Sequence, residues 1–155
     1  MTSRQKNSFK NNLYQKAITI ISQRISNADA AMQEAQHAAN EEEKSSAGDK
    51  YETSRAMSHL QKDMFAKQSE ENKKELAQLR TIDCNKLFDR VTAGCVIVFE
   101  EFFFFIAAGI GKIDFEGKTG FLLSPNAPLA KILHDKKQGD IIKFNNKEIV
   151  IRSVF

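Results

Sequence analysis

The sequence contains few of the residues that interrupt regular structure, and their positions divide it. Only seven of its 155 residues are glycine and two are proline, and the first 93 residues contain one glycine, Gly48, and no proline. Because glycine and proline are the strongest breaks in a helical pattern, we expect long uninterrupted helices on both sides of Gly48. The segment around Gly48 is then the turn that joins them.

Cysteine is scarce and tryptophan is absent. The two cysteines, Cys84 and Cys95, form no CxxC pair and do not have the spacing of metal ligands, which argues against a disulfide framework and a zinc site. We therefore expect two unreactive, reduced thiols, as is usual in the cytoplasm.

No hydrophobic run is long enough to span a membrane. The longest extends from Phe102 to Ile110 and includes Gly109, whereas a membrane-spanning helix needs about 20 apolar residues. The first residues are polar and no apolar core follows them, so we expect no signal peptide, no membrane contact and a cytoplasmic location.

Excess positive charge is also small. The net charge of +3 does not by itself indicate nucleic-acid binding. Four cations lie near the N-terminus: Arg4, Lys6, Lys10 and Lys16. We interpret them as part of a solvated, frayed end, with a weak phosphate contact as the alternative.

The periodicity of the first half predicts an antiparallel coiled coil. Between Ser8 and Glu43, apolar residues recur at alternating spacings of four and three, as in a heptad seam. They are Tyr14, Ile18, Ile21, Ile25, Ala28, Met32, Ala35 and Ala39. A second helix is expected from Lys50 to Leu79, with a less regular seam. One register contains Met57, Leu60 and Met64, and the other contains Phe65, Asn72, Leu76 and Leu79, so we expect a slip near residue 65.

The tip of this hairpin, near residues 44–50, is rich in carboxylates. Glu41, Glu42 and Glu43 precede it, and Asp49 and Glu52 follow Gly48. Asp49 with Glu52 fits a helix cap followed by an acid three residues later. The same pair would lie on one face of the first turn of the second helix.

The second half predicts a small α+β unit. Nine of the 12 phenylalanines lie after position 98, and the helical period gives way to short strand patterns. Expected strands are 95–99, 102–108, 119–123, 141–144 and 148–154, with a loop over 109–117. A short helix over 129–134 would turn Leu129, Ile132 and Leu133 inward. The expected fold class is α+β, with a coiled-coil hairpin over residues 1–82 and a mainly antiparallel sheet with one helix over residues 83–155.

One stretch of the second half resembles a known family. The run from Ser124 to Asp140, SPNAPLAKILHDKKQGD, is similar to the C-terminal signature of the Gre-type bacterial transcription elongation factors. The entry to the first strand, Ala93-Gly94-Cys95-Val96, and the order of the parts are also similar. The resemblance implies an FKBP-like C-terminal domain.

The resemblance also implies a function. In that family the globular domain docks on the rim of the RNA polymerase secondary channel, and the loop that meets the rim corresponds to Asn126, Pro128 and Leu129. The hairpin enters the channel, where acidic tip residues help to hold a Mg²⁺ ion of the polymerase active site while the polymerase cleaves backtracked RNA. By this resemblance Asp49 and Glu52 are the catalytic and metal-assisting residues. The protein would be a monomeric accessory factor, not an enzyme itself, and would meet DNA and RNA only through the polymerase.

The tip departs from the family pattern, in which an Asp and a Glu three residues apart precede a Tyr. Aligned on Tyr51, those positions are Lys44 and Ala47, whereas Asp49 and Glu52 keep the spacing five residues further along. Two versions therefore stay open: stimulation of transcript cleavage, and occupation of the channel without cleavage. The rivals from other classes are a peptidyl-prolyl isomerase, which the absence of tryptophan disfavours, and a structural coiled coil that dimerises through its arm.

Overall fold

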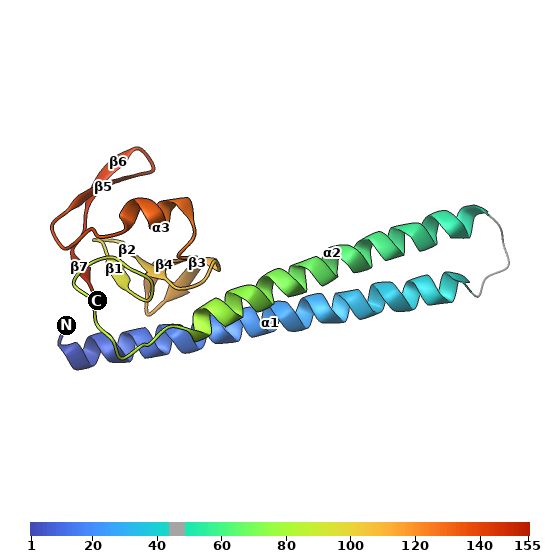
Figure 1. Ribbon diagram of the computed structural model, residues 1–155, viewed down its shortest axis with the longest axis horizontal. Helices are drawn as coiled ribbons and strands as arrows, with labels where there is room; N and C mark the ends of the chain where they lie inside the picture. The colour runs from blue at the N-terminus through green and yellow to red at the C-terminus, as the bar shows by residue number, and fades with distance from the viewer. Residues whose placement is uncertain (44–48) are drawn as a thin grey trace. The chain divides into compact units, whose positions relative to one another are not determined.

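The computed structural model describes residues 1–43 and 49–155, with the backbone alone at residues 42, 43 and 49–51. Two long helices come first, α1 (Ser3–Glu43) and α2 (Asp49–Arg80). Strands and one short helix follow: β1 (Val96–Val98), β2 (Phe102–Ile106), β3 (Gly111–Phe115), β4 (Lys118–Leu123), α3 (Pro128–Leu133), β5 (Ile141–Phe144), β6 (Lys147–Val150) and β7 (Ser153–Val154). Figure 1 shows this order along the chain. The α+β prediction is confirmed.

The chain separates into two compact units. Residues 21–74 form one, here called the hairpin unit, and residues 1–20 with 75–155 form the other, here called the sheet unit. The start of α1 and the end of α2 therefore belong to the sheet unit, and the rest of both helices belongs to the hairpin unit. The expected turn around Gly48 falls within residues 44–48, which lie outside the described residues.

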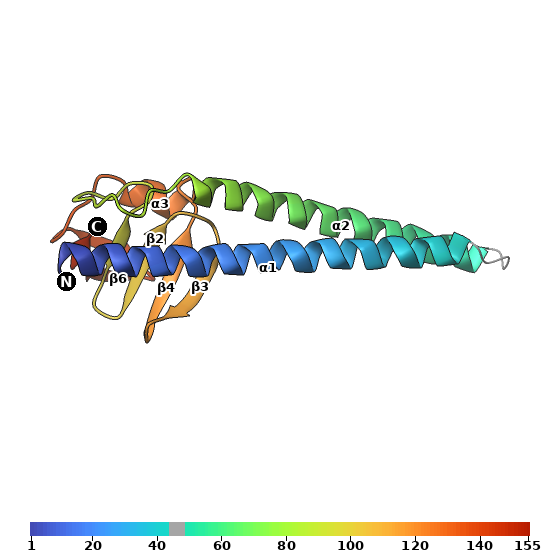
Figure 2. The same ribbon diagram turned by 90° about the horizontal axis from the view of Figure 1, so that it is seen from below.

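In the hairpin unit, α1 and α2 lie side by side and run antiparallel (Figures 1 and 2). The α1 seam is as predicted from Ile21 onward. Ile21, Ala28, Ala35 and Ala39 are buried, with Ile25 and Met32 partly buried between them. Small alanines allow the two backbones to approach closely.

The α2 seam differs from the prediction. Met57, Leu60 and Met64 are 53%, 63% and 48% exposed, so their proposed register is wrong. The helix instead keeps one register, without a slip, at alternating spacings of four and three residues. Its members are Ser58, Lys62, Phe65, Ser69, Asn72, Leu76 and Leu79, all buried or partly buried.

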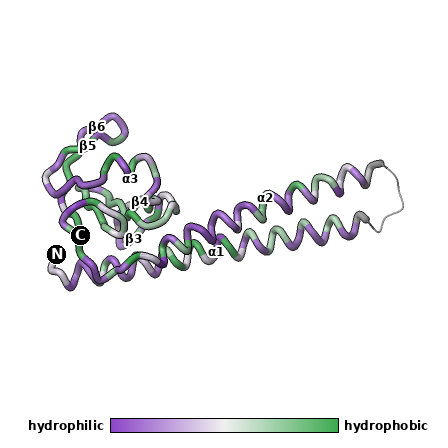
Figure 3. Tube along the Cα trace, in the orientation of Figure 1, coloured by the Kyte–Doolittle hydropathy of each residue, from purple (hydrophilic) through white to green (hydrophobic). Residues whose placement is uncertain are grey.

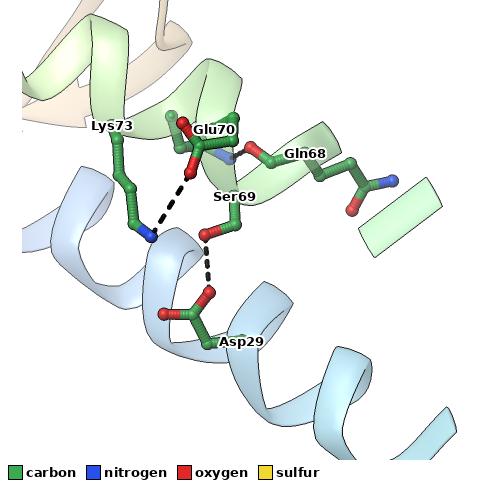
Figure 4. Close-up of polar contacts among 6 residues, drawn as sticks. Asp29, Gln68, Ser69, Glu70 and Lys73 are labelled. Carbon is green, nitrogen blue, oxygen red and sulfur yellow. Dashed lines mark hydrogen bonds and ion pairs between the residues drawn. The ribbon is translucent and has the colours of Figure 1, made fainter. Parts of the chain in front are cut away.

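A polar contact across the hairpin fixes how the two helices align. The Ser69 hydroxyl donates a hydrogen bond of 2.5 Å to the Asp29 carboxylate, and Figure 4 shows both side chains pointing into the space between the helices. Nearby on α2, Lys73 forms an exposed ion pair with Glu70, at 3.7 Å. Since Ser69 is buried, sliding one helix along the other would leave its hydroxyl and the carboxylate without partners.

The sheet unit contains a five-stranded sheet in the order β3-β4-β2-β1-β7, and a separate β5-β6 hairpin. All pairs are antiparallel except β2 with β4. Strand β3 corrects the expected loop over 109–117. Its residues alternate, with Ile113 and Phe115 buried and the others exposed. The predicted tight turn between β5 and β6 is confirmed, because Asn145 and Asn146 both have positive φ, as a two-residue hairpin turn requires.

Phenylalanines build the core of the sheet unit. Phe103, Phe104 and Phe105 are buried, as predicted for this apolar run, and the hydropathy colouring in Figure 3 shows the same concentration. Phe103 lies opposite Gly120 in the β2-β4 pair. A Cβ atom at Gly120 would lie 2.2 Å from the Phe103 ring, so glycine is what allows that ring to cross β4.

The first turns of α1 belong to this core rather than to a frayed end. Phe9 packs edge-on against Phe103, Phe115 and Phe155, with ring centroids 5.4, 5.1 and 6.1 Å away. Leu13 and Ala17 are buried, whereas the predicted seam residues Tyr14 and Ile18 are only partly buried. The seam is displaced by one residue here because α1 faces the sheet unit instead of the middle of α2.

Removing the Ser69 hydroxyl should destabilise the protein. We expect Ser69→Ala to lower the free energy of unfolding by about 1.5–3 kcal/mol, because a partly buried carboxylate loses a charge-assisted hydrogen bond. Urea unfolding followed by helical circular dichroism measures this. The control is Ser54→Ala, an exposed serine on the same helix, expected to change stability by no more than about 0.5 kcal/mol. Equal effects of the two substitutions would contradict the role of the Asp29–Ser69 contact.

Candidate functional site

The two tip carboxylates lie in the first turn of α2. The helix begins at Asp49, and Glu52 is exposed three residues later. Residues three apart lie on one face of a helix, so the backbone places both positions on the same side. The side chains of Asp49 and Tyr51 lie outside the described residues, as do those of Glu42 and Glu43. Glu41 is exposed at the end of α1 and lies 4.0 Å from His37.

These carboxylates could contribute to a magnesium site only together with a partner. Mg²⁺ in proteins is commonly held by one or two carboxylates, with waters and substrate phosphates as the remaining ligands. Asp49 and Glu52 supply two carboxylates in suitable sequence positions. Among the residues that the structure describes, no group of three or more acidic, histidine or cysteine side chains could hold a metal ion.

The second predicted site, the turn before α3, is divided between surface and core. The Ser124 hydroxyl and carbonyl accept hydrogen bonds from the backbone N–H groups of Asn126 (3.2 Å) and Ala127 (3.0 Å). Pro128 then occupies the first position of α3, where its fixed φ favours helix initiation. Asn126 and Pro128 are exposed. Leu129 instead packs against the buried cluster of the sheet unit, so its side chain is only partly available to a partner.

Ile132 was expected to face inward, and this was wrong. It is 68% exposed, and Ala130 and Leu133 are the buried residues of α3. Pro128 and Ile132 are four residues apart and therefore share one face of the helix. Together with Asn126 they form what we call the α3 surface, a set of exposed residues that includes one large apolar side chain, that of Ile132. The sequence pattern missed Ile132 because a six-residue helix contains too few turns to define an inward face.

A buried lysine lies close to both cysteines. Lys10 has no exposed surface, and its ammonium donates a hydrogen bond of 2.6 Å to the Lys86 carbonyl and lies 4.7 Å from the centre of the Phe88 ring. Burial lowers the pKa of Lys10. The interpretation of Lys10 as a solvated cation was wrong. Lys16 is exposed, as that interpretation requires, although its ammonium also donates a hydrogen bond of 2.7 Å to the Asp114 carbonyl.

Burial also affects the pKa of the two cysteine thiols. It raises the pKa of Cys84, and it raises the pKa of Cys95 to about 11. A thiolate is the reactive form of cysteine, so a thiol that keeps its proton at neutral pH is a poor nucleophile. The raised pKa values agree with the prediction of unreactive thiols.

The comparisons with known proteins add no identification. No family model matches the chain, and neither does any curated protein or solved structure. In the part of the chain that the structure describes, no helix is both long and apolar enough to cross a bilayer.

The Cys95 thiol predicts a loss of stability in alkali. Its folded pKa of about 11 exceeds the ordinary value of 9.0, so the unfolded chain releases this proton first. The protonated Cys95 thiol contributes fully to the free energy of unfolding below pH 9. This contribution is lost as the pH rises towards 11, and the total loss is at most about 2–3 kcal/mol. Cys95→Ala should therefore show a shallower alkaline decline in the free energy of unfolding than the unsubstituted protein. The control is Cys84→Ala, which should retain most of the alkaline decline because Cys84 is the less buried thiol. If Cys95→Ala and the unsubstituted protein lose stability in parallel as the pH rises, the decline does not come from the Cys95 thiol.

Proposed function

We propose that this protein is an accessory factor of bacterial RNA polymerase that inserts its helical hairpin into the secondary channel. The observation that carries the proposal is the position of Asp49 and Glu52 at the start of α2, immediately after the chain reverses between two long helices. Within the hairpin unit, residues 21–43 of α1 extend roughly 33 Å at 1.5 Å per residue. Residues at the far end of two such paired helices can reach a site that a compact domain cannot enter.

The proposed chemistry uses the carboxylates of this chain and the active site of the polymerase. Asp49 and Glu52 would bind Mg²⁺ directly or through its waters and orient it towards the phosphate that is attacked. In two-metal sites such an ion stabilises the attacking and leaving oxygens of a displaced phosphate. The polymerase supplies the other ligands and cleaves its own backtracked transcript, so the protein is not an enzyme by itself.

The α3 surface is the proposed docking site on the polymerase. Asn126, Pro128 and the exposed Ile132 lie together on the sheet unit, and an exposed apolar residue surrounded by polar ones is typical of the centre of an interface. Leu129 would contribute by holding α3 against the core. In this proposal the protein acts in the cytoplasm as a monomer and contacts DNA and RNA only within the polymerase complex.

A reconstituted backtracked elongation complex tests both activities. We expect the protein to bind the complex and to accelerate transcript cleavage, and Asp49→Ala and Glu52→Ala each to reduce that acceleration at least about tenfold without loss of binding. Glu34→Ala, which removes an exposed acid from α1, is the matched control and should cleave normally. Binding without acceleration by the unsubstituted protein would favour occupation of the channel, and failure to bind the polymerase would overturn the proposal.

The docking surface is tested in the same complexes. Ile132→Ser should weaken binding, whereas Ile141→Ser removes an equally large exposed residue, at 59% exposure, from β5 and should leave binding unchanged.

A second candidate function is peptidyl-prolyl isomerisation, which a cleft in the sheet unit favours. This cleft of about 250 Å³ is lined by Phe99, Phe102, Ile149 and Val150, with Glu100, Glu101, Glu148 and Arg152 also on its walls. Phe99 and Phe102 stack with ring centroids 4.7 Å apart. Aromatic walls suit a proline ring, although the carboxylates make this cleft more polar than an ordinary ligand pocket.

A proline-isomerisation assay with a short proline peptide tests this candidate. If the cleft is catalytic, the rate of isomerisation should exceed the uncatalysed rate and should fall with Phe102→Ala. A rate equal to the uncatalysed one would exclude the isomerase.

A further inference from the structure

A second cleft of the sheet unit gathers positive charge. It has a volume of about 500 Å³, and its lining includes Lys6, Phe88, Asp89, Arg90, Lys137 and Gln138. The cations come from three separate parts of the sequence: the start of α1, the connector before β1, and the segment after α3. Only one carboxylate, that of Asp89, accompanies three cationic side chains.

The backbone holds two of these cations against each other. Arg90 and Lys137 form an isolated antiparallel bridge. Directly opposite residues in such a pair project their side chains to the same face, with Cβ atoms about 4.5–5.5 Å apart, and like charges there destabilise the pairing. The fold therefore tolerates a repulsion that two neutral residues would avoid.

The described contacts do not neutralise this repulsion. Within residues 1–43 and 49–155, none of the three cations forms an ion pair. Arg90 donates to the Asp135 carbonyl at 3.3 Å, which leaves its other donors available. The Lys6 ammonium lies 5.4 Å from the centre of the Phe155 ring. Asp89 is the one acid among the residues that line the cleft. The Asp140 carboxylate accepts a hydrogen bond of 2.8 Å from the backbone N–H of Lys137, which leaves the exposed Lys137 side chain available to a ligand.

We infer that this cleft binds a phosphate-bearing small ligand, with Arg90 and Lys137 as the principal contacts. A guanidinium offers a planar fork of donors that matches phosphate oxygens, and a lysine adds a compact charge. The volume falls within the range of small-molecule sites and exceeds the needs of one phosphate group. The ligand class is therefore a polyphosphate, either free or carried by a nucleotide, for which Phe88 and Gln138 provide an apolar and an amide contact.

This inference does not depend on the proposed function. The cleft lies in the sheet unit and contains neither the tip carboxylates nor the residues of the α3 surface. If the protein binds the polymerase but not polyphosphate, only this inference fails. If it binds polyphosphate but not the polymerase, only the proposed function fails.

Calorimetric titration of the full chain with tripolyphosphate and with ATP tests the inference. We expect saturable binding that weakens as salt rises, and at least tenfold weaker binding by Arg90→Gln and by Lys137→Gln. Lys112→Gln and Lys118→Gln are the matched controls, since they remove exposed cations from β3 and β4, and they should bind as the unsubstituted protein does. Tighter binding of ATP would assign the nucleotide as the ligand, and equal binding of both probes would assign the polyphosphate group alone.

The stability of the ligand-free variants provides an independent measurement. Relief of the repulsion predicts that Arg90→Gln and Lys137→Gln melt at or above the temperature of the unsubstituted protein without ligand, yet lose the rise in melting temperature that tripolyphosphate causes. Absence of saturable binding with both probes, or equal weakening by Lys112→Gln, would overturn the inference.

Discussion

The seam of small buried side chains between α1 and α2 is the constraint on which the hairpin depends. Ala28, Ala35 and Ala39 of α1 are buried, and Ser58 and Ser69 occupy the seam of α2. Such a seam buries less apolar area than one built from leucines, so it provides less hydrophobic stabilisation. The alignment of α1 with α2 then depends on specific contacts, and the Asp29–Ser69 hydrogen bond is one of them. The backbone position of the tip acids follows from that alignment.

The two units are stabilised by different physical means. The sheet unit has an aromatic core in which phenylalanines from α1, the sheet and the last residue of the chain meet edge to face. Aromatic pairs of this kind add to the stabilisation that burial provides. In the hairpin unit, hydrophilic and hydrophobic residues alternate along both helices, as the colouring of Figure 3 shows. Substitutions in the sheet unit will therefore act mainly through packing, and those in the hairpin unit through alignment.

How far the sequence predicted the structure depended on whether burial coincided with hydrophobicity. In α1 it did, since alanines and isoleucines at heptad spacing mark the buried face. In α2 it did not, because serine, lysine and asparagine line the seam while Met57 and Leu60 face outward. Strand β3 was missed because its glycines were given more weight than the alternation of Ile113 and Phe115. The cleft between Arg90 and Lys137 required a pairing across 47 positions of the chain, which no local pattern contains.

The outward position of the α2 methionines has a consequence for oxidative damage. Met57 and Met64 present their thioethers to solvent, and oxidants convert such groups to polar sulfoxides. In a seam that change would separate the helices, but at positions that are 53% and 48% exposed water can solvate the new oxygen. The hairpin should therefore keep its pairing when these two sulfur atoms are oxidised.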